Sequence, residues 1–396
     1  MLKIKYIAAT VLNILIAFFV AFPCQCAAEA GAAEDFEKTY TVAADGLYEP
    51  WIVDDNIYTY KKIKKAEIIS SVPLFGIYIK YDRMPSSFTV TADGVVLPEE
   101  SCEYLHQYMQ LSGAKNVVIE YSEETSVADV FAFSEKEPPD FVQRWETLDR
   151  ADIMICPTHS DDDQLYFAGM IPWCSAKGNK VQVVYFTNHW NTHDRPHELL
   201  DGLWHCSDKY YPVISEFPDL YAENPEQARL LYASCGFEEK DFIDFYLDLF
   251  GHLKPMVVVG HDINGEYGHG VHCLNSEIVR KAVCVSAEKG IWDVPKTYMH
   301  LWDKNKTVFD WDAPMDEFQG KSAFNISQEA FGFHKSQHVF QSLLNWLNGT
   351  DSMPVTKASQ ITRYSPCDFG LYRTTVGTDA AENGLFDNVA TYTDRE

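Results

Sequence analysis

The hydrophobic and polar positions follow two different rhythms along the chain, and the change comes near Arg150. Before it, short runs of β-forming residues with alternating polarity are separated by turn signals such as Asp93-Gly94. Such runs with no long helical period are typical of an antiparallel sheet. The runs cover residues 75–81, 87–92, 116–121 and 127–133. The pattern therefore predicts an antiparallel β-sandwich domain over residues 35–140.

After Arg150, short and wholly apolar runs alternate with amphipathic segments, as buried strands alternate with helices in an α/β domain. The predicted strands cover residues 153–156, 180–186, 255–260 and 297–301, and the predicted helices 165–174, 195–204, 271–287 and 328–347. This alternation predicts a Rossmann-like, mostly parallel sheet with helices on both faces. The domain is expected to span residues 148–396, including a C-terminal extension. Such sheets bind ligands at the carboxyl ends of their strands.

The first residues are typical of an export signal. Lys3 and Lys5 precede an apolar run over residues 6–22, and small residues follow it up to Ala30. This order predicts a signal peptide over residues 1–30, and an uncleaved signal anchor is the alternative because the apolar run is long. No later stretch of the sequence is long and apolar enough to span a bilayer. We therefore expect a secreted or otherwise extracytoplasmic protein.

Charge and cysteine content narrow the partners. The chain has 32 Lys plus Arg against 58 Asp plus Glu, a net charge of −26, which would repel phosphate backbones. Nucleic acid is therefore not an expected partner. The ten cysteines would allow disulfides in an exported protein, but they include no C-x-x-C pair. The sequence settles neither their pairing nor the oligomeric state.

A first group of candidate catalytic residues follows the strand over 153–156. His159 stands in the loop after this strand, and Asp162 comes three residues later, at the start of the next helix. An imidazole and a carboxylate placed in this way can be two of the three protein ligands of an open catalytic zinc site. Asp161, between them, can reach a water at the same ion. The alternative is structural, since acidic residues also cap helices and complement the helix dipole.

A second group follows the strand over 255–260. His269 and His272 lie three residues apart on a glycine-rich loop that enters a helix. In a doubly wound sheet both groups meet at the same edge, so this pair can supply the third ligand and a spare acid. The two groups are 113 positions apart (272 − 159), and only the folded sheet would bring them together.

These residues resemble the signatures of the LmbE-like, PIG-L-type N-acetylglucosamine deacetylases. Residues 159–163 are similar to the A-H-P-D-D-E loop of that family, and residues 269–272 to its H-P-D-H loop. The similarity covers residues 150–290, and residues 333–337 resemble an H-x-S-Q element near the end of the family's domain. The β-sandwich domain resembles galactose-binding-like modules only loosely.

The resemblance implies a role for each candidate residue. His159, Asp162 and His272 would bind the metal, one zinc ion in most members, although another divalent metal is possible. Asp161 would be the general base. His269 would polarise the substrate carbonyl or protonate the leaving amine. Arg195 would grip sugar hydroxyls.

One departure from the family bears on catalysis. Gly270-Val271 replaces the usual Pro-Asp, and the family's Asp is thought to orient its catalytic histidine. Val271 cannot do so. Either Asp262 or Glu266 is expected to become the partner of His269, or His269 is less basic and the enzyme is slower.

Together these observations predict a zinc-dependent hydrolase that removes the N-acetyl group of an N-acetylglucosamine-type sugar or glycoconjugate outside the cytoplasm. Metal-activated water with an aspartate general base is the expected mechanism. Two alternatives stay open: an amidase of another acylated amine on the same metal site, and a catalytically inactive carbohydrate-binding surface protein. Substrate profiling distinguishes the first, and metal content together with activity distinguishes the second.

Overall fold

A computed structural model describes residues 39–98, 104–380 and 384–395. The predicted signal peptide over residues 1–30 lies outside these ranges. Residues 40–396 form one unit by their internal contacts. Among the described residues, no helix has the length and apolar character needed to cross a membrane.

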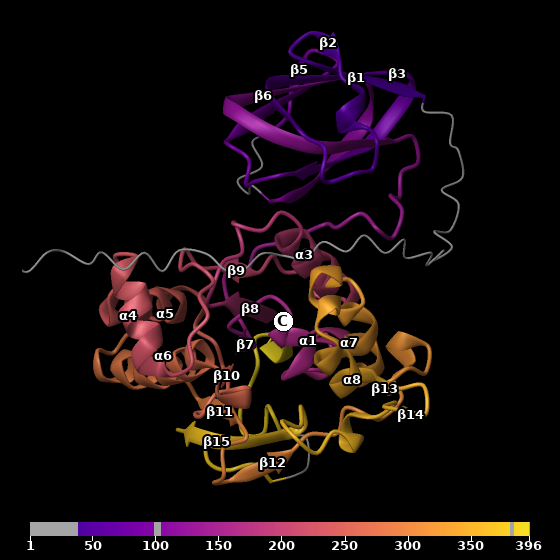
Figure 1. Cartoon of the computed structure of the whole chain (residues 1–396). Coiled ribbons are helices and arrows are strands. Elements are labelled where there is room, and N and C mark those ends of the chain that lie inside the picture. The colour runs from indigo at the N-terminus through magenta and orange to yellow at the C-terminus, as the bar shows by residue number, and fades with distance from the viewer. Residues whose placement is uncertain (1–38, 99–103, 381–383, 396) are drawn as a thin grey trace, which may run out of the picture. The chain divides into compact units, whose positions relative to one another are not determined.

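The N-terminal part is a six-stranded sheet with the order β2-β1-β3-β6-β4-β5 (Figure 1). Its strands are β1 (Tyr40–Ala44), β2 (Leu47–Tyr48), β3 (Lys61–Tyr81), β4 (Phe88–Ala92), β5 (Val95–Val96) and β6 (His106–Phe133). Burial alternates along much of β3, as expected for a sheet with one face on a core.

The two long strands make this sheet fold back on itself. Partner numbers along β6 fall as those along β3 rise, so the register is antiparallel in sense, with Ile68 opposite Val117. Ile77 is paired twice, with Met109 and with Ala132, so the two ends of β6 flank the end of β3. The predicted antiparallel β-domain is confirmed. Its strands form one sheet that folds back on itself, where the prediction was a sandwich.

The C-terminal part is built on a seven-stranded sheet with the order β12-β15-β11-β10-β7-β8-β9. Its strands are β7 (Ile153–Cys156), β8 (Val181–Tyr185), β9 (Val213–Ile214), β10 (Val257–Gly260), β11 (Lys296–His300), β12 (Lys306–Val308) and β15 (Asp368–Thr374). β7 to β11 pair in parallel, and β15 and β12 add an antiparallel edge. β13 (Gly349–Thr350) and β14 (Met353–Pro354) form a separate hairpin. The predicted fold class is confirmed.

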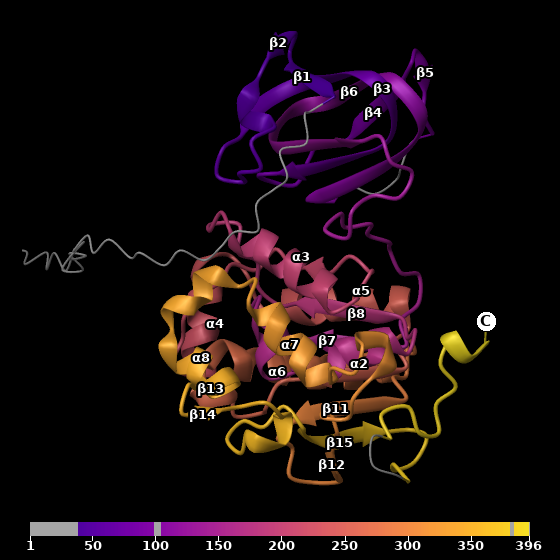
Figure 2. The same cartoon turned by 90° about the vertical axis from the view of Figure 1, so that its right-hand side faces the viewer.

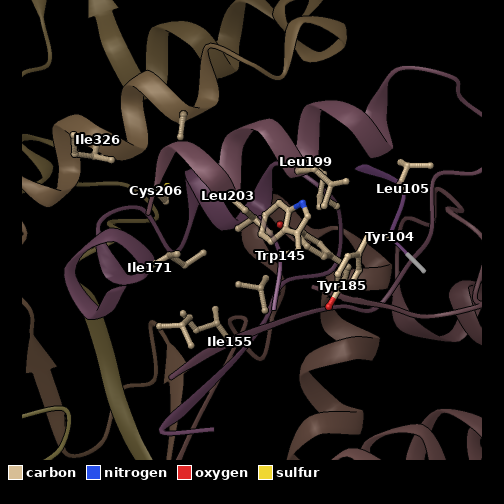
Figure 3. Close-up of a cluster of buried hydrophobic side chains, with 14 of the residues drawn as sticks. Tyr104, Leu105, Trp145, Ile155, Ile171, Tyr185, Leu199, Leu203, Cys206 and Ile326 are labelled. Atoms are coloured by element: carbon tan, nitrogen blue, oxygen red, sulfur yellow. The ribbon is translucent and has the colours of Figure 1, made fainter. Parts of the chain in front are cut away.

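Helices cover both faces of this sheet (Figures 1 and 2). They are α1 (Asp162–Leu165), α2 (Met170–Ala176), α3 (Arg195–His205), α4 (Pro225–Ser234), α5 (Glu239–Leu253), α6 (Gly270–Glu288), α7 (Ala323–Phe331) and α8 (Gln341–Asn348). Successive residues of β7 point to opposite faces, so Met154 joins the core under α4, α5 and α6, and Ile155 joins the core under α2, α3 and α7. In Figure 3, Leu199 and Leu203 of α3 lie near Trp145 and Tyr185 in this second core.

Two predicted helices are each divided in the structure. The helix predicted over 165–174 is α1 and α2, and the break falls at Gly169, which has a φ of +89°. A Cβ atom at Gly169 would lie 2.5 Å from Trp311 Cγ, so glycine is needed for packing as well as conformation. The helix predicted over 328–347 is the end of α7 followed, after a short 3-10 turn at Lys335–Val339, by α8.

Candidate metal centre and active site

The two groups of candidate residues meet at one edge of the parallel sheet. β7 and β10 are neighbours, and their last residues, Cys156 and Gly260, are in register. The loop after β7 carries His159 into the short helix α1, and the loop after β10 leads through a 3-10 turn into α6. The parallel register therefore brings together residues separated by more than 100 positions.

Three of the predicted residues place their ligand atoms around one point. His159 Nδ1 lies 3.2 Å from Asp162 Oδ2 and 3.0 Å from His272 Nε2, and Asp162 Oδ2 lies 3.3 Å from His272 Nε2. A tetrahedral zinc ion with bonds of about 2.0 to 2.1 Å needs donor atoms separated by about 3.3 Å. The three side chains are buried, and two imidazoles with one carboxylate form the donor set of an open catalytic zinc site.

Each of the two imidazoles has a carboxylate behind it. His272 Nδ1 lies 2.8 Å from Glu266 Oε2, and His159 Nε2 lies 3.4 Å from Asp219 Oδ1. Because the protonated nitrogens face these carboxylates, the lone pairs of His159 Nδ1 and His272 Nε2 are left for a metal. Burial lowers the pKa of His159, but hydrogen bonds with Asp162 and Asp219 outweigh this and raise it to about 9. Metal binding would therefore release protons.

Two sets of potential ligands occur among the described residues, and hydrogen bonding separates ligands from supports. One set is His159, His269 and His272, and the other is Asp162, His261 and His272. His261 Nε2 accepts a hydrogen bond from Thr158 N at 2.9 Å, and its Nδ1 lies 2.7 Å from Glu266 Oε2. His261 therefore has no free lone pair, so its position here is structural.

Asp161, the predicted general base, lies beside this centre in an unusual backbone conformation. Its φ is +150°, which is costly for a residue with a side chain. Asp161 Oδ1 lies 3.3 Å from Arg195 Nη2. Burial is the largest effect on its carboxyl group and raises the pKa to about 7, against the opposing charge of Arg195. A carboxylate that titrates near neutrality suits proton transfer at neutral pH.

Arg195 is engaged within the protein. Its Nη2 donates to Ser160 O at 3.0 Å and to Asp161, and its Nη1 donates to Asp219 Oδ2 at 3.3 Å. The guanidinium thus holds the candidate base and the carboxylate behind His159. The predicted contact of Arg195 with sugar hydroxyls stays a prediction.

His269 lies next to the predicted ligands, with its ring centroid 4.9 Å from that of His159. It is the N-cap of α6, and its Nδ1 accepts a hydrogen bond from Val271 N at 3.2 Å. A nitrogen that accepts carries no proton, so the neutral ring is protonated at Nε2. Burial and the neighbouring His159 and His272 lower the pKa of His269 to about 2.

In the part of the chain that the structure describes, neither Asp262 nor Glu266 forms a hydrogen bond with His269. Asp262 Oδ1 accepts from Asn264 N at 3.1 Å within its own loop. Glu266 points into the interior from the 3-10 turn at Glu266–Gly268 and bonds His272 instead of His269. Of the three expectations, the structure agrees with the third, a less basic His269.

The 189–195 loop, which enters α3, is fixed at its ends and in its middle. At one end His189 Nε2 accepts from Ser160 N at 3.0 Å, and at the other Arg195 bonds Asp161. In the middle, His193 Nδ1 lies 2.7 Å from Asp82 Oδ1, and His193 Nε2 bonds Ile57 O. The N-terminal sheet and the segment before β3 therefore hold the tip of a loop whose two ends reach the candidate site.

Three supporting residues were missed by the sequence analysis: Asp219, His261 and His300. Asp219 follows β9 with no recognisable motif, and His300 ends β11. His300 Nδ1 lies 2.6 Å from Glu266 Oε1. One signal was available for His300, because it stands at the carboxyl end of a predicted buried strand, where ligands gather in this type of sheet.

Comparison with known proteins agrees with these motifs over part of the chain. A curated 1D-myo-inositol 2-acetamido-2-deoxy-alpha-D-glucopyranoside deacetylase from Nocardia farcinica is 49% identical over 51 residues, 13% of this chain. The enzyme of the same name from Mycolicibacterium smegmatis is 31% identical over 77 residues, 19% of this chain. The predicted resemblance is confirmed. The matches span only 17% and 26% of the length of those relatives.

No family model matches the chain. Among solved structures, the N,N'-diacetylchitobiose deacetylase from Pyrococcus horikoshii is similar with a TM-score of 0.37 and 16% identity, covering 62% of this chain and 89% of that one. A likeness of this size carries no weight for function.

Proposed function

We propose that the protein is a zinc-dependent N-deacetylase that acts on an N-acetylglucosamine-type sugar or glycoconjugate. One observation carries the proposal: His159 Nδ1, Asp162 Oδ2 and His272 Nε2 converge at 3.0 to 3.3 Å, with the base candidate Asp161 beside them. The partial similarity to deacetylases of an acetamido sugar supports the substrate class. An extracytoplasmic substrate is part of the proposal and rests on the predicted leader.

The residues of the chain divide the work of amide hydrolysis. A zinc ion held by the three ligands would lower the pKa of a water molecule and polarise the acetamide carbonyl. Asp161 accepts a proton from the attacking water, and its pKa of about 7 leaves much of it ionised near neutrality. Arg195 keeps the Asp161 carboxylate turned toward the site by the hydrogen bond to Oδ1. The acquired proton is then available for the departing amine, which leaves poorly unless protonated.

His269 acts as a neutral hydrogen-bond donor. Because its Nδ1 accepts from Val271 N, its Nε2–H is the group that can donate to the oxyanion that develops on the acetamide oxygen. A donor of this kind does not need to change its protonation state during the reaction. Asp161 is then the proton carrier, in contrast to a mechanism with an imidazolium acid.

Acetate release tests the proposal. Zinc-reconstituted protein, Asp161→Asn and the matched carboxylate variant Asp262→Asn would be incubated with a panel of N-acetylhexosamine glycans. We expect acetate from the wild type and from Asp262→Asn, whose carboxylate serves its own loop, and none above background from Asp161→Asn. Zinc binding without acetate release from any acetylated sugar would contradict the proposal and favour a carbohydrate-binding protein.

A further inference from the structure

Glu266 is a fully buried carboxylate surrounded by three histidines. Its Oε2 lies 2.7 Å from His261 Nδ1 and 2.8 Å from His272 Nδ1, and its Oε1 lies 2.6 Å from His300 Nδ1. Oε1 also accepts from Asp262 N at 3.2 Å. The three imidazole rings and the carboxylate have no exposed surface. Only His272 among these histidines belongs to the metal ligands proposed above.

The hydrogen-bond partners fix the protonation of each ring. His261 Nε2 accepts from Thr158 N, and its Nδ1 faces Glu266. His272 needs a proton only on Nδ1. His300 differs, since its Nδ1 faces the carboxylate and its Nε2 faces Ser365 O at 2.9 Å. Ser365 O can only accept, and an ionised Glu266 carboxylate can only accept as well, so hydrogen bonds to both would require a proton on each ring nitrogen of His300.

We propose that Glu266 and His300 form a buried ion pair that positions His272 for the metal. The proposal deepens the proposed function, on which its metal-binding part rests. The carboxylate of Glu266 contacts the predicted metal ligand His272 and not His269.

The charge balance explains why His300 is needed. Burying a carboxylate without a cation is unfavourable, and removing one partner of a buried ion pair is strongly destabilising. The His300 imidazolium cancels the charge of Glu266, so the group adds no net charge beneath the metal ligands. Glu266 can then accept hydrogen bonds at both oxygens, which prevents its rotation and holds the His272 ring with Nε2 toward Asp162.

The surroundings keep this pair away from water. The Phe167 ring centroid lies 4.9 Å from that of His261, and Tyr166 lies 5.9 Å from His272 and 6.1 Å from His300. A low local dielectric strengthens both the ion pair and its hydrogen bonds. β11 is the neighbour of β10, with Met299 in register with Gly260, so a third strand end contributes to the site.

Metal affinity and histidine NMR test the inference without using activity. The dissociation constant for zinc would be measured by competition with a chromophoric chelator for the wild type, Glu266→Gln, His300→Gln and the double variant. Supports of metal-bound histidines change affinity by about 10- to 100-fold when removed, and we expect this loss in each single variant. The double variant should lose about as much as one single variant, because the two residues act as a unit.

The matched control is Glu329→Gln. Glu329 also pairs with a histidine, with Oε2 3.1 Å from His205 Nε2, but this pair is partly exposed. Its zinc dissociation constant should stay within twofold of the wild type. Circular dichroism would establish that each variant is folded.

Nitrogen-15 spectra of the metal-free wild type test the charge directly. The His300 signals, assigned by their loss in His300→Gln, should show both ring nitrogens protonated at neutral pH. The spectra also test the ion pair if Glu266→Gln does not fold.

Unchanged zinc affinity in Glu266→Gln would overturn the positioning role, and a neutral His300 would overturn the ion pair. Losses that multiply in the double variant would overturn the coupling between them. A wild type that binds zinc but releases no acetate would instead contradict the proposed function, and the affinity comparison would still decide the role of Glu266.

Discussion

Gly270, the first residue of α6, packs so closely against the start of α4 that we expect any larger residue at this position to destabilise the protein. A Cβ atom at this position would lie 2.3 Å from Asn224 O and 2.6 Å from Asn224 C and N. These are backbone atoms at the start of α4, so the clash cannot be relieved by a side-chain rotation. Gly270 N also donates to Ala222 O at 2.7 Å. A proline at this position would introduce the clash and remove this hydrogen bond.

The expected losses follow from these contacts. In Gly270→Ala, overpacking costs about 3 kcal/mol, and the helix preference of alanine returns about 1 kcal/mol, so the free energy of unfolding should fall by about 2 kcal/mol. In Gly270→Pro, the unpaired Ala222 carbonyl adds about 1 to 3 kcal/mol. Zinc affinity should fall as well, because the displaced end of α6 carries His269 and His272.

Urea unfolding with Gly251→Ala as the control checks this prediction. Gly251 also lies in a helix, α5, but a Cβ atom there would meet Ile291 Cγ2 at 3.4 Å, an ordinary contact. Gly251→Ala should therefore raise the free energy of unfolding by about 0.5 to 1 kcal/mol. Equal stability of Gly270→Ala and the wild type would refute the reasoning, because it would mean that α4 and α6 separate at no cost.

Three further predictions concern buried titratable side chains: Asp161, His197 and Lys296. Asp161→Asn should lower the rate of deacetylation by about 10²- to 10⁴-fold while zinc binding is retained. The wild-type rate should fall as the pH drops below about 7, because Asp161 then becomes protonated. Steady-state rates measured against pH for both proteins check these two expectations. His106 Nε2 lies 2.7 Å from His197 Nδ1, and burial, with His193 and other cations, lowers the pKa of His197 to about 3. Since an unfolded histidine titrates near 6.5, this stabilisation is complete above about pH 6.5 and is lost as pH falls toward 3, and His197→Gln should flatten the acid side of a plot of melting temperature against pH. Lys296→Met should lower the free energy of unfolding by about 3 to 5 kcal/mol, because it leaves Asp379 without its buried cation, and a smaller loss in Lys296→Met/Asp379→Asn would support that cause.

The parts of the fold that were predictable from the sequence are those set by local pattern. The apolar run at Ile153–Cys156 is a strand with the predicted bounds, and the strand at 255–260 is one with two residues fewer. The prediction of a single helix over 165–174 was wrong, although a glycine within the run, Gly169, indicated a possible break. The break falls at Gly169, where Trp311, more than 140 positions away, leaves no room for a Cβ atom. No local pattern shows such a contact.

The candidate site divides in the same way. The candidate metal ligands and the candidate base stand in short motifs after strands, and the sequence predicted that they meet. Their supports do not share this property, since Asp219 and His300 come from separate segments outside the motifs. Glu266 was noticed because it lies in the motif loop, but the choice of His272 over His269 depends on which way the 3-10 turn directs its side chain.

Through the 189–195 loop, the N-terminal part of the chain contacts a segment that borders the candidate site. A shortened protein that begins at Leu148 would keep every candidate ligand and both general-acid and base candidates, yet it would lose Asp82 and Ile57 as the acceptors of His193. The loop would then be held only at its two ends, by His189 and by Arg195. Kinetic constants measured on such a fragment would describe an enzyme whose 189–195 loop is less firmly held beside the candidate site. Truncated proteins should therefore be compared with the intact chain before the N-terminal sheet is regarded as unnecessary for activity.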